Sequence, residues 1–175
     1  MSDFVIKPLD DNTIDTQVEI FNQAFNKNAT TDTWRYKHFQ NPLIKDLGIS
    51  TILGAYSGET LVGIGAFMPV TFSVADKKIT AVQACDASIR PEWQGKGLYT
   101  YINSYAENYY KERGIDVIFA LPYPDFGSYF CFKKLGWEDI YTVSTAFIPV
   151  NLANILKSRI HVPVPSFVNV ITKKY

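Results

Sequence analysis

Residues 94–99, which read Gln-Gly-Lys-Gly-Leu-Tyr, constrain the fold of this chain more than any other segment. A strand-like run over 84–89 precedes them, and apolar residues at helical spacing follow. Two glycines between a strand and a helix N-terminus leave several backbone N–H groups unpaired in one concave turn. The helix dipole adds its positive end, so such a turn binds anions. The segment therefore predicts a phosphate or pyrophosphate cradle, to which Gln94 and Lys96 contribute a neutral donor and a positive charge.

Two common phosphate-binding loops do not match this turn. A Walker loop needs a glycine five residues before its Gly-Lys pair and a Ser or Thr after the lysine, but Arg90 and Gly97 occupy those positions. A dinucleotide-binding loop needs a third glycine at position 100, where the chain has Thr100. A glycine turn that only connects a strand to a helix remains open on these residues alone.

The segments after the turn also follow a regular order. The apolar positions of the helix form one stripe, at Leu98, Tyr101, Ile102, Tyr105, Ala106 and Tyr109. Lys111 and Arg113 near its end and Gly114 just beyond are typical of a helix C-terminus. A short buried strand is expected over 116–121 and a second short helix over 125–136.

This order of elements, with Gln94, Gly95 and Gly97 at the turn, resembles the acetyl-CoA-binding half of the GNAT superfamily of N-acetyltransferases. The pyrophosphate loop of that family reads Arg or Gln, two residues, Gly, one residue, then Gly or Ala. Tyr99 departs from this pattern at the last position, as in a branch of the family with a larger residue there. The family's closing motif of Asn, Tyr and Gly-Phe falls here on Asp125, Phe132, Gly136 and Trp137.

The resemblance implies an α/β fold with a central mixed, mostly antiparallel sheet flanked by helices over residues 1–149. It also implies that acetyl-CoA binds at the turn as a co-substrate and that no metal is needed. The pantetheine arm is expected to pair with the strand at Ala87, Ser88 and Ile89. The rest of the cofactor site is expected at the loop and the two helices, with contacts from Gln94, Gly95, Lys96, Gly97, Leu98, Tyr99, Asp125 and Phe132.

Acetyl transfer at such a site needs no covalent enzyme intermediate, because a neutral amine attacks the thioester directly. Asp86 lies beside the expected acyl site and is the best candidate for a general base, with a structural hydrogen bond as its alternative role. Phe132 occupies the slot where the family often has a tyrosine that protonates the leaving thiolate, and a phenyl ring cannot donate a proton. Tyr129 or solvent is therefore expected to supply that proton. For Asp125, capping of the following helix is the alternative role.

The composition argues against several other functions. The sequence holds 17 basic and 17 acidic side chains without a basic run among aromatic residues, so binding to nucleic acid or to an anionic membrane is not expected. No apolar run approaches a membrane span and the N-terminus does not read as a signal peptide, so we expect a cytoplasmic protein. Cys85 and Cys131 are expected to be reduced and inert, and His38 and His161 are too isolated to predict a metal site.

The first half of the chain is expected to supply two helices and most of the sheet. Strands are predicted over 4–9, 50–56, 60–67 and 79–89. Pro69 is expected to bend the third of these runs or to change its partner. Helices are predicted over 14–25, with a capping box that begins at Thr16, and over 31–40, where Pro42 prevents further extension.

Residues 150–175 lie beyond the predicted domain. They are compatible with a last strand, with a dimer arm that would make a homodimer, or with the truncated start of a further domain. The sequence as a whole favours an enzyme that moves an acetyl group from acetyl-CoA to a primary amine of a small molecule or sugar. Two alternatives stay open: a CoA-binding regulatory domain without turnover, which Phe132 favours, and one half of a longer two-domain acetyltransferase.

Overall fold

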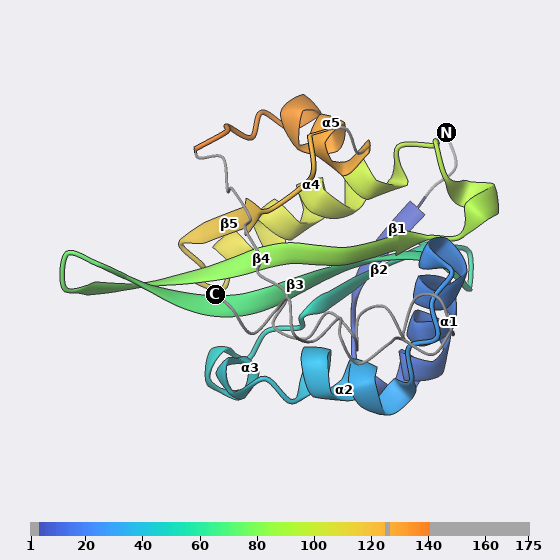
Figure 1. Cartoon of the computed structure of the whole chain (residues 1–175), viewed down its shortest axis with the longest axis horizontal. Coiled ribbons are helices and arrows are strands. Elements are labelled where there is room, and N and C mark those ends of the chain that lie inside the picture. The colour runs from blue at the N-terminus through green and yellow to red at the C-terminus, as the bar shows by residue number, and fades with distance from the viewer. Residues whose placement is uncertain (1–3, 125–126, 141–175) are drawn as a thin grey trace, which may run out of the picture. The chain divides into compact units, whose positions relative to one another are not determined.

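The computed structural model describes residues 4–124 and 127–140. These residues form five strands, five α-helices and two short 3-10 turns, labelled in Figure 1. The strands are β1 (Phe4–Leu9), β2 (Ile52–Ser57), β3 (Thr60–Val74), β4 (Lys77–Ile89) and β5 (Val117–Ala120). The helices are α1 (Ile14–Phe25), α2 (Thr31–Phe39), α3 (Pro42–Leu47), α4 (Leu98–Lys111) and α5 (Gly127–Lys134), and the 3-10 turns are η1 (Asp11–Thr13) and η2 (Pro91–Trp93).

The strands form one sheet in the order β1-β2-β3-β4-β5. The first four are antiparallel neighbours, and β5 joins β4 in parallel after the crossover through α4. Helices α1 and α2 cover one face of the sheet, and α4 and α5 cover the other (Figure 1). The predicted α/β fold with a mostly antiparallel sheet flanked by helices is therefore confirmed.

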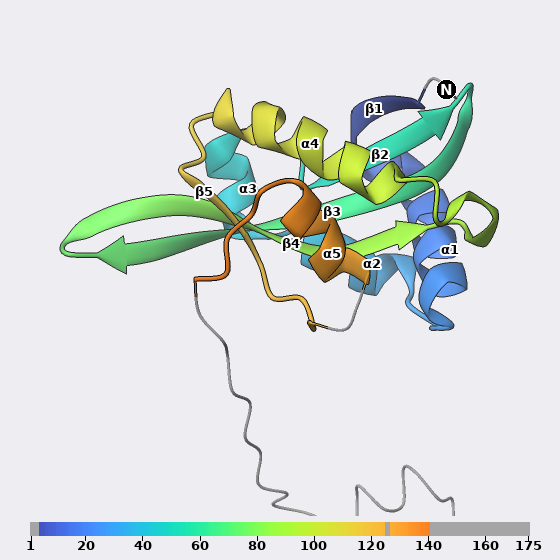
Figure 2. The ribbon, with the colours of Figure 1, turned by 90° about the horizontal axis from the view of Figure 1, so that it is seen from above.

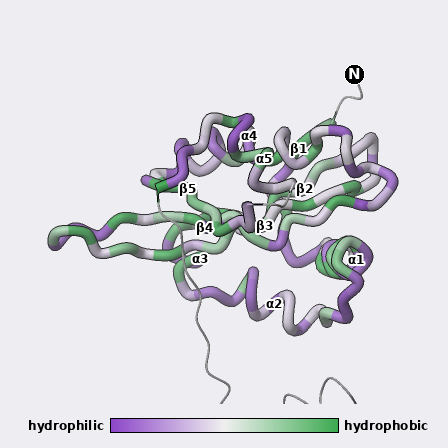
Figure 3. The backbone as a smooth tube through the Cα atoms, turned by 45° about the horizontal axis from the view of Figure 1, so that its top comes forward, coloured by the Kyte–Doolittle hydropathy of each residue, from purple (hydrophilic) through white to green (hydrophobic). Residues whose placement is uncertain are grey.

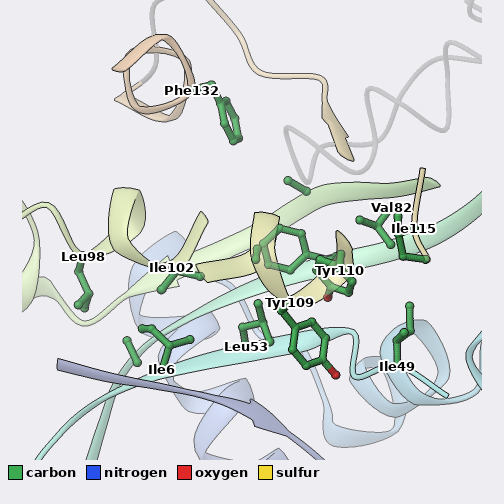
Figure 4. Close-up of a cluster of buried hydrophobic side chains, with 14 of the residues drawn as sticks. Ile6, Ile49, Leu53, Val82, Leu98, Ile102, Tyr109, Tyr110, Ile115 and Phe132 are labelled. Atoms are coloured by element: carbon green, nitrogen blue, oxygen red, sulfur yellow. The ribbon is translucent and has the colours of Figure 1, made fainter. Parts of the chain in front are cut away.

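Each face of the sheet carries its own apolar core, because alternate residues of a strand point to opposite faces. Leu53 and Ala55 of β2 belong to the core under α4, whereas Ile52 belongs to the core under α1 and α2. Figure 4 shows side chains of α4 such as Tyr110 directed toward the sheet in the first of these cores. Colouring by hydropathy places the apolar residues mainly along the central strands, with polar residues on the outer sides of the helices (Figure 3).

The β3–β4 hairpin is longer than the sequence predicts. It extends beyond the helices in two perpendicular views (Figure 1, Figure 2). The expected change of partner at Pro69 is wrong, since β3 runs through it and Pro69 pairs with Val82 of β4. Within the described residues, the pairing of β3 with β2 ends at Ala66, and Phe67 N–H still donates to the carbonyl oxygen of Thr51. A proline is tolerated at Pro69 because a strand edge without a partner needs no N–H donor.

One predicted detail of the helices is wrong, and one helix, α3, is not predicted by the sequence. Helix α1 begins at Ile14, after a 3-10 turn that is capped by Asp10, so Thr16 lies inside the helix and forms no capping box. The Asn-Pro pair that follows α2 starts a further helix, α3. The side chain of Asn41 accepts a hydrogen bond from Leu43 N, and Pro42 occupies the first helical position, where a missing N–H costs nothing.

The predictions for Asp125, for the remainder of the domain up to 149 and for the segment 150–175 concern residues outside the described ranges.

Candidate functional site

Strands β4 and β5 diverge in the middle of the molecule. They pair in parallel from Ala81 with Val117 to Ala84 with Ala120, and β5 ends there. Strand β4 continues to Ile89, and over 85–89 its pairing within the described part of the chain is with β3 alone. One edge of β4 therefore has no strand partner over this segment among the described residues, which is the arrangement that an extended ligand can join as an additional strand.

A β-bulge marks the point where the strands separate. Between the pairs of Ala66 with Cys85 and of Ile64 with Ser88, two residues of β4 stand opposite one residue of β3. One of the two is Asp86, whose φ of 42° lies in the left-handed region. Such a conformation is uncommon outside glycine, although aspartate tolerates it better than most residues do.

The glycine turn lies where the free edge of β4 ends. Gly95 has a φ of 74° and Gly97 a φ of 77°, conformations that favour glycine. Helix α4 begins at Leu98 with Gly97 as its N-cap, and no side chain caps it. The first N–H groups of α4 are thus open to an anionic ligand, and the helix dipole supports negative charge there.

The polar side chains of the loop have contacts within the chain. Gln94 Nε2 donates a hydrogen bond of 3.0 Å to the carbonyl oxygen of Ile89, which fixes the loop to the end of β4. The ammonium of Lys96 lies 4.4 Å from the centre of the Trp93 ring. The backbone amides of the turn and the ammonium of Lys96 therefore remain as the groups that can meet an anion there.

A cleft of about 790 Å³ opens between the separated strands, the glycine loop and α5. Most of the predicted site residues line it, namely Asp86, Ala87, Ile89, Gln94, Gly95, Gly97, Leu98, Tyr99 and Phe132. Ser88, Lys96 and Tyr129 do not line it. The side chain of Ser88 is buried, and its hydroxyl donates a hydrogen bond of 3.2 Å to the carbonyl oxygen of Asp86.

Two residues of α2 meet the carboxylate of Asp86. The Lys37 ammonium forms an ion pair with Asp86 Oδ2, and His38 Nε2 lies 3.2 Å from the same oxygen. Burial opposes ionisation of this carboxyl, but the hydrogen bonds of His38 and Lys37 and the positive charge of Lys37 outweigh it, so the pKa of Asp86 is lowered. Since an ionised carboxylate only accepts, His38 donates through Nε2–H.

Helix α2 is held in place by buried polar contacts. Trp34 Nε1 donates to Gln17 Oε1 on α1 at 2.9 Å, and the Trp34 ring packs 4.3 Å from the His38 ring. The Thr51 hydroxyl donates to the carbonyl oxygen of His38. His38 Nδ1 is buried and has no hydrogen-bond partner among the described residues. A buried N–H without a partner is costly, so this arrangement favours a neutral ring with its proton on Nε2.

Tyr99, in the first turn of α4, also lines the cleft. Its ring lies edge-on to the ring of Phe132, with the centroids 5.7 Å apart. Burial raises the pKa of Tyr99, and the thiols of Cys131 and Cys85 are close enough to affect that pKa as well. The Tyr99 ring therefore packs against the phenyl ring that occupies the family's tyrosine slot, and a hydrogen bond with the Asn103 side chain opposes part of the rise in the pKa of Tyr99.

The cleft also contains Cys85, one residue before the bulge. Burial and the negative charge of Asp86 raise the pKa of its thiol to about 11. The thiolate is the nucleophilic form of cysteine, so this thiol is inert at neutral pH, as the sequence predicts.

Sequence reasoning missed Lys37 and His38 as part of the site. They lie about fifty positions before Asp86, and nothing in their spacing indicates that α2 packs on the bulge of β4. Among the residues for which coordinates are described, no group of three potential ligands could hold a metal ion. No helix in this part of the chain is long and apolar enough to cross a membrane.

A comparison with family models identifies the family of the chain. The acetyltransferase (GNAT) domain matches residues 5–140, and the chain belongs to this family. A search of curated proteins finds no match.

Solved structures show the same fold at low sequence identity. Glucosamine-6-phosphate N-acetyltransferase from Arabidopsis thaliana matches with a TM-score of 0.61 at 15% identity, over 84% of this chain and 99% of that one. AAC(6')-Iy in complex with the bisubstrate analog CoA-S-monomethyl-acetylneamine matches with a TM-score of 0.66 at 11% identity, over 85% and 99%. An aminoglycoside acetyltransferase from an uncultured soil metagenomic sample, in complex with sisomicin, matches with a TM-score of 0.61 at 14% identity, over 83% and 97%.

Proposed function

We propose that this protein transfers an acetyl group from acetyl-CoA to a primary amine of a small molecule or sugar. The observation that carries the proposal is the free edge of β4, which ends at an amide-rich glycine turn and an uncapped helix N-terminus within one cleft. The similar structures that act on glucosamine 6-phosphate or bind aminoglycosides support an amino sugar as acceptor.

Backbone groups form the cofactor side in this proposal. The edge of β4 at Ala87 and Ile89 pairs with the amides of the pantetheine arm. The amides of Gly95, Gly97 and the first turn of α4 bind the pyrophosphate. The apolar cleft wall around Phe132 excludes water from the thioester.

Asp86 faces the acceptor in this proposal. Because its pKa is lowered, the carboxyl stays ionised at neutral pH and is a weak general base. Attraction and orientation of an acceptor ammonium is therefore its main role, and proton removal by solvent precedes attack.

Tyr99 replaces Tyr129 as the group that assists the leaving sulfur. Tyr99 lines the cleft, whereas Tyr129 does not. Its raised pKa keeps the phenol protonated, so it acts as a hydrogen-bond donor to the developing thiolate, and water supplies the proton.

Titration calorimetry with acetyl-CoA, CoA and dephospho-CoA tests the proposal first. Binding with a dissociation constant in the micromolar range is expected, followed by release of free thiol with at least one amine of a broad panel. Folded protein that binds none of the three cofactors would refute the cofactor site. Binding without thiol release across the panel would favour the CoA-binding regulatory domain, which the phenyl ring of Phe132 in the tyrosine slot supports.

A further inference from the structure

The chain brings one of its own primary amines to the acyl end of the cleft. Asp86 lines the cleft and directly precedes Ala87, where the free edge of β4 lies. Lys37 reaches this carboxylate from α2, on the face of the sheet opposite α4 (Figure 1). The Lys37 side chain is 41% exposed and that of Asp86 is 20% exposed, so solvent reaches the pair. Lys37 itself does not line the cleft, but its ammonium contacts the carboxylate that orients an acceptor ammonium in the proposed function.

We propose that Lys37 is a site of self-acetylation, modified by acetyl-CoA bound in the chain's own cleft. This inference rests on the proposed function. The Lys37 ammonium first gives a proton to water. Its Nζ then forms a bond to the acetyl carbon while the carbon–sulfur bond breaks. The nitrogen releases its second proton to water, and the released thiolate takes a proton from water. Each event consumes one acetyl-CoA and yields acetyl-lysine, free CoA and one net proton.

Acetylation changes the acceptor end of the cleft, because the amide that forms carries no charge. The ion pair with Asp86 is lost, and the carboxylate keeps His38 as its partner. Asp86 is then free to bind an external ammonium in place of that of Lys37. Self-acetylation of this kind would precede full activity toward an added amine.

Other lysines provide internal references for this reaction. Lys96 lies over Trp93 at the loop, and Lys134 lines the cleft from the last turn of α5. Lys7 is on β1 and lies over the ring of Tyr56 on β2. Strand β1 is the edge strand of the sheet opposite β5, so Lys7 is remote from the cleft. Lys7 therefore reports the rate of uncatalysed acetylation.

The test is peptide mass spectrometry of the whole chain after incubation with isotopically labelled acetyl-CoA. The peptide that contains Lys37 is expected to gain label at least about tenfold faster than that of Lys7, because proximity raises the effective concentration of the thioester. Excess CoA should slow labelling of Lys37 and leave Lys7 unchanged. Equal rates at Lys37 and Lys7, or faster labelling of Lys96 or Lys134, would overturn the inference.

Two controls separate this inference from the proposed function. Calorimetry on the same sample establishes whether acetyl-CoA binds. Binding without preferential labelling of Lys37 refutes self-acetylation and leaves the proposed function standing, whereas absence of binding refutes both. The variant Lys37→Arg keeps a positive charge for Asp86 but lacks a nucleophilic amine. It should bind acetyl-CoA as the wild type does and lose the fast-labelled peptide, and fast labelling elsewhere in this variant would contradict the assignment.

Discussion

The two ends of the cleft are built on different principles. At the end proposed to bind the cofactor, here called the cofactor end, the donors are mainly backbone amides of the glycine turn and of α4, while Gln94 bonds to Ile89 and Lys96 lies over Trp93. At the acyl end, a carboxylate on a β-bulge is held by side chains from a helix on the other face of the sheet. A site made of backbone tolerates many sequences as long as the glycines stay, whereas a site made of side chains depends on each residue.

The largest effect is expected from Gly97→Glu, which changes the glycine turn at the cofactor end of the cleft. Any side chain is strained at a φ of 77°, and the added carboxylate repels the pyrophosphate. Affinity for CoA should fall by more than about a hundredfold, measured by calorimetry. The matched control is Gly58→Glu in the β2–β3 turn, where φ is 59° and a Cβ likewise meets open space. An equal loss of CoA affinity in both variants would show that the substitutions act by unfolding the protein. The contrast between the two ends of the cleft would then have no support from this experiment.

The next largest effect is expected from Tyr99→Phe, which removes the hydroxyl that is proposed to assist the leaving sulfur. Loss of one hydrogen-bond donor to the leaving sulfur should lower kcat/KM by roughly ten- to a hundredfold with little change in CoA affinity. Introducing a hydroxyl with Phe132→Tyr in the Tyr99→Phe background should restore part of the rate, since the two rings are in contact. Unchanged turnover in Tyr99→Phe would show that the Tyr99 hydroxyl does not stabilise the leaving thiolate.

The difference between the two ends also explains what the sequence could reveal. The glycine turn, the stripe of α4 and the residues of the free edge of β4 are contiguous in the chain, so their local pattern predicts the cofactor end. The predicted strand 4–9 and the helix 14–25 match β1 and α1 in their bounds for the same reason, since period and turn residues are local signals.

The acyl end depends on long-range contacts that no local pattern contains. The sequence indicates Asp86 as a carboxylate on a strand, but the bulge arises from the pairing of β4 with β3, and the partners of Asp86 come from α2. Burial and ion pairing decide the pKa of this carboxyl, so its basicity could not be judged before the fold was known. Likewise, Tyr129 follows Ser128 in the chain, yet Ser128 lines the cleft and Tyr129 does not.

A third prediction concerns the contribution of Asp86, at the acyl end of the cleft, to the free energy of unfolding. Asp86→Asn keeps a residue that tolerates a positive φ but removes the charge, so Lys37 and His38 lose an ionised partner. We expect the free energy of unfolding at pH 7 to fall by about 2 kcal/mol, measured by urea denaturation. The control is Asp76→Asn in the β3–β4 turn, another aspartate at positive φ but with an exposed side chain.

The sign of the pH dependence follows from the lowered pKa of Asp86. Its contribution to stability is fully present above the unfolded-state pKa of about 3.9 and is lost as the pH falls through the lower folded-state pKa. The gap between wild type and Asp86→Asn should therefore be constant from neutral pH down to about pH 5 and narrow below about pH 3.9. A gap that widens in acid would mean that the carboxyl is protonated in the native protein.

The smallest effect is expected from Gln94→Met, which removes an amide from the cofactor end without shortening the side chain. Loss of the hydrogen bond to the Ile89 carbonyl should lower the free energy of unfolding by about 0.5–1 kcal/mol. If backbone amides bind the pyrophosphate, affinity for CoA should change by less than about threefold, a difference of under 1 kcal/mol. Calorimetry and urea denaturation on the same preparation measure both quantities. A tenfold or greater loss of affinity would place the Gln94 amide on the phosphates, and the cofactor end would then depend on its side chains as the acyl end does.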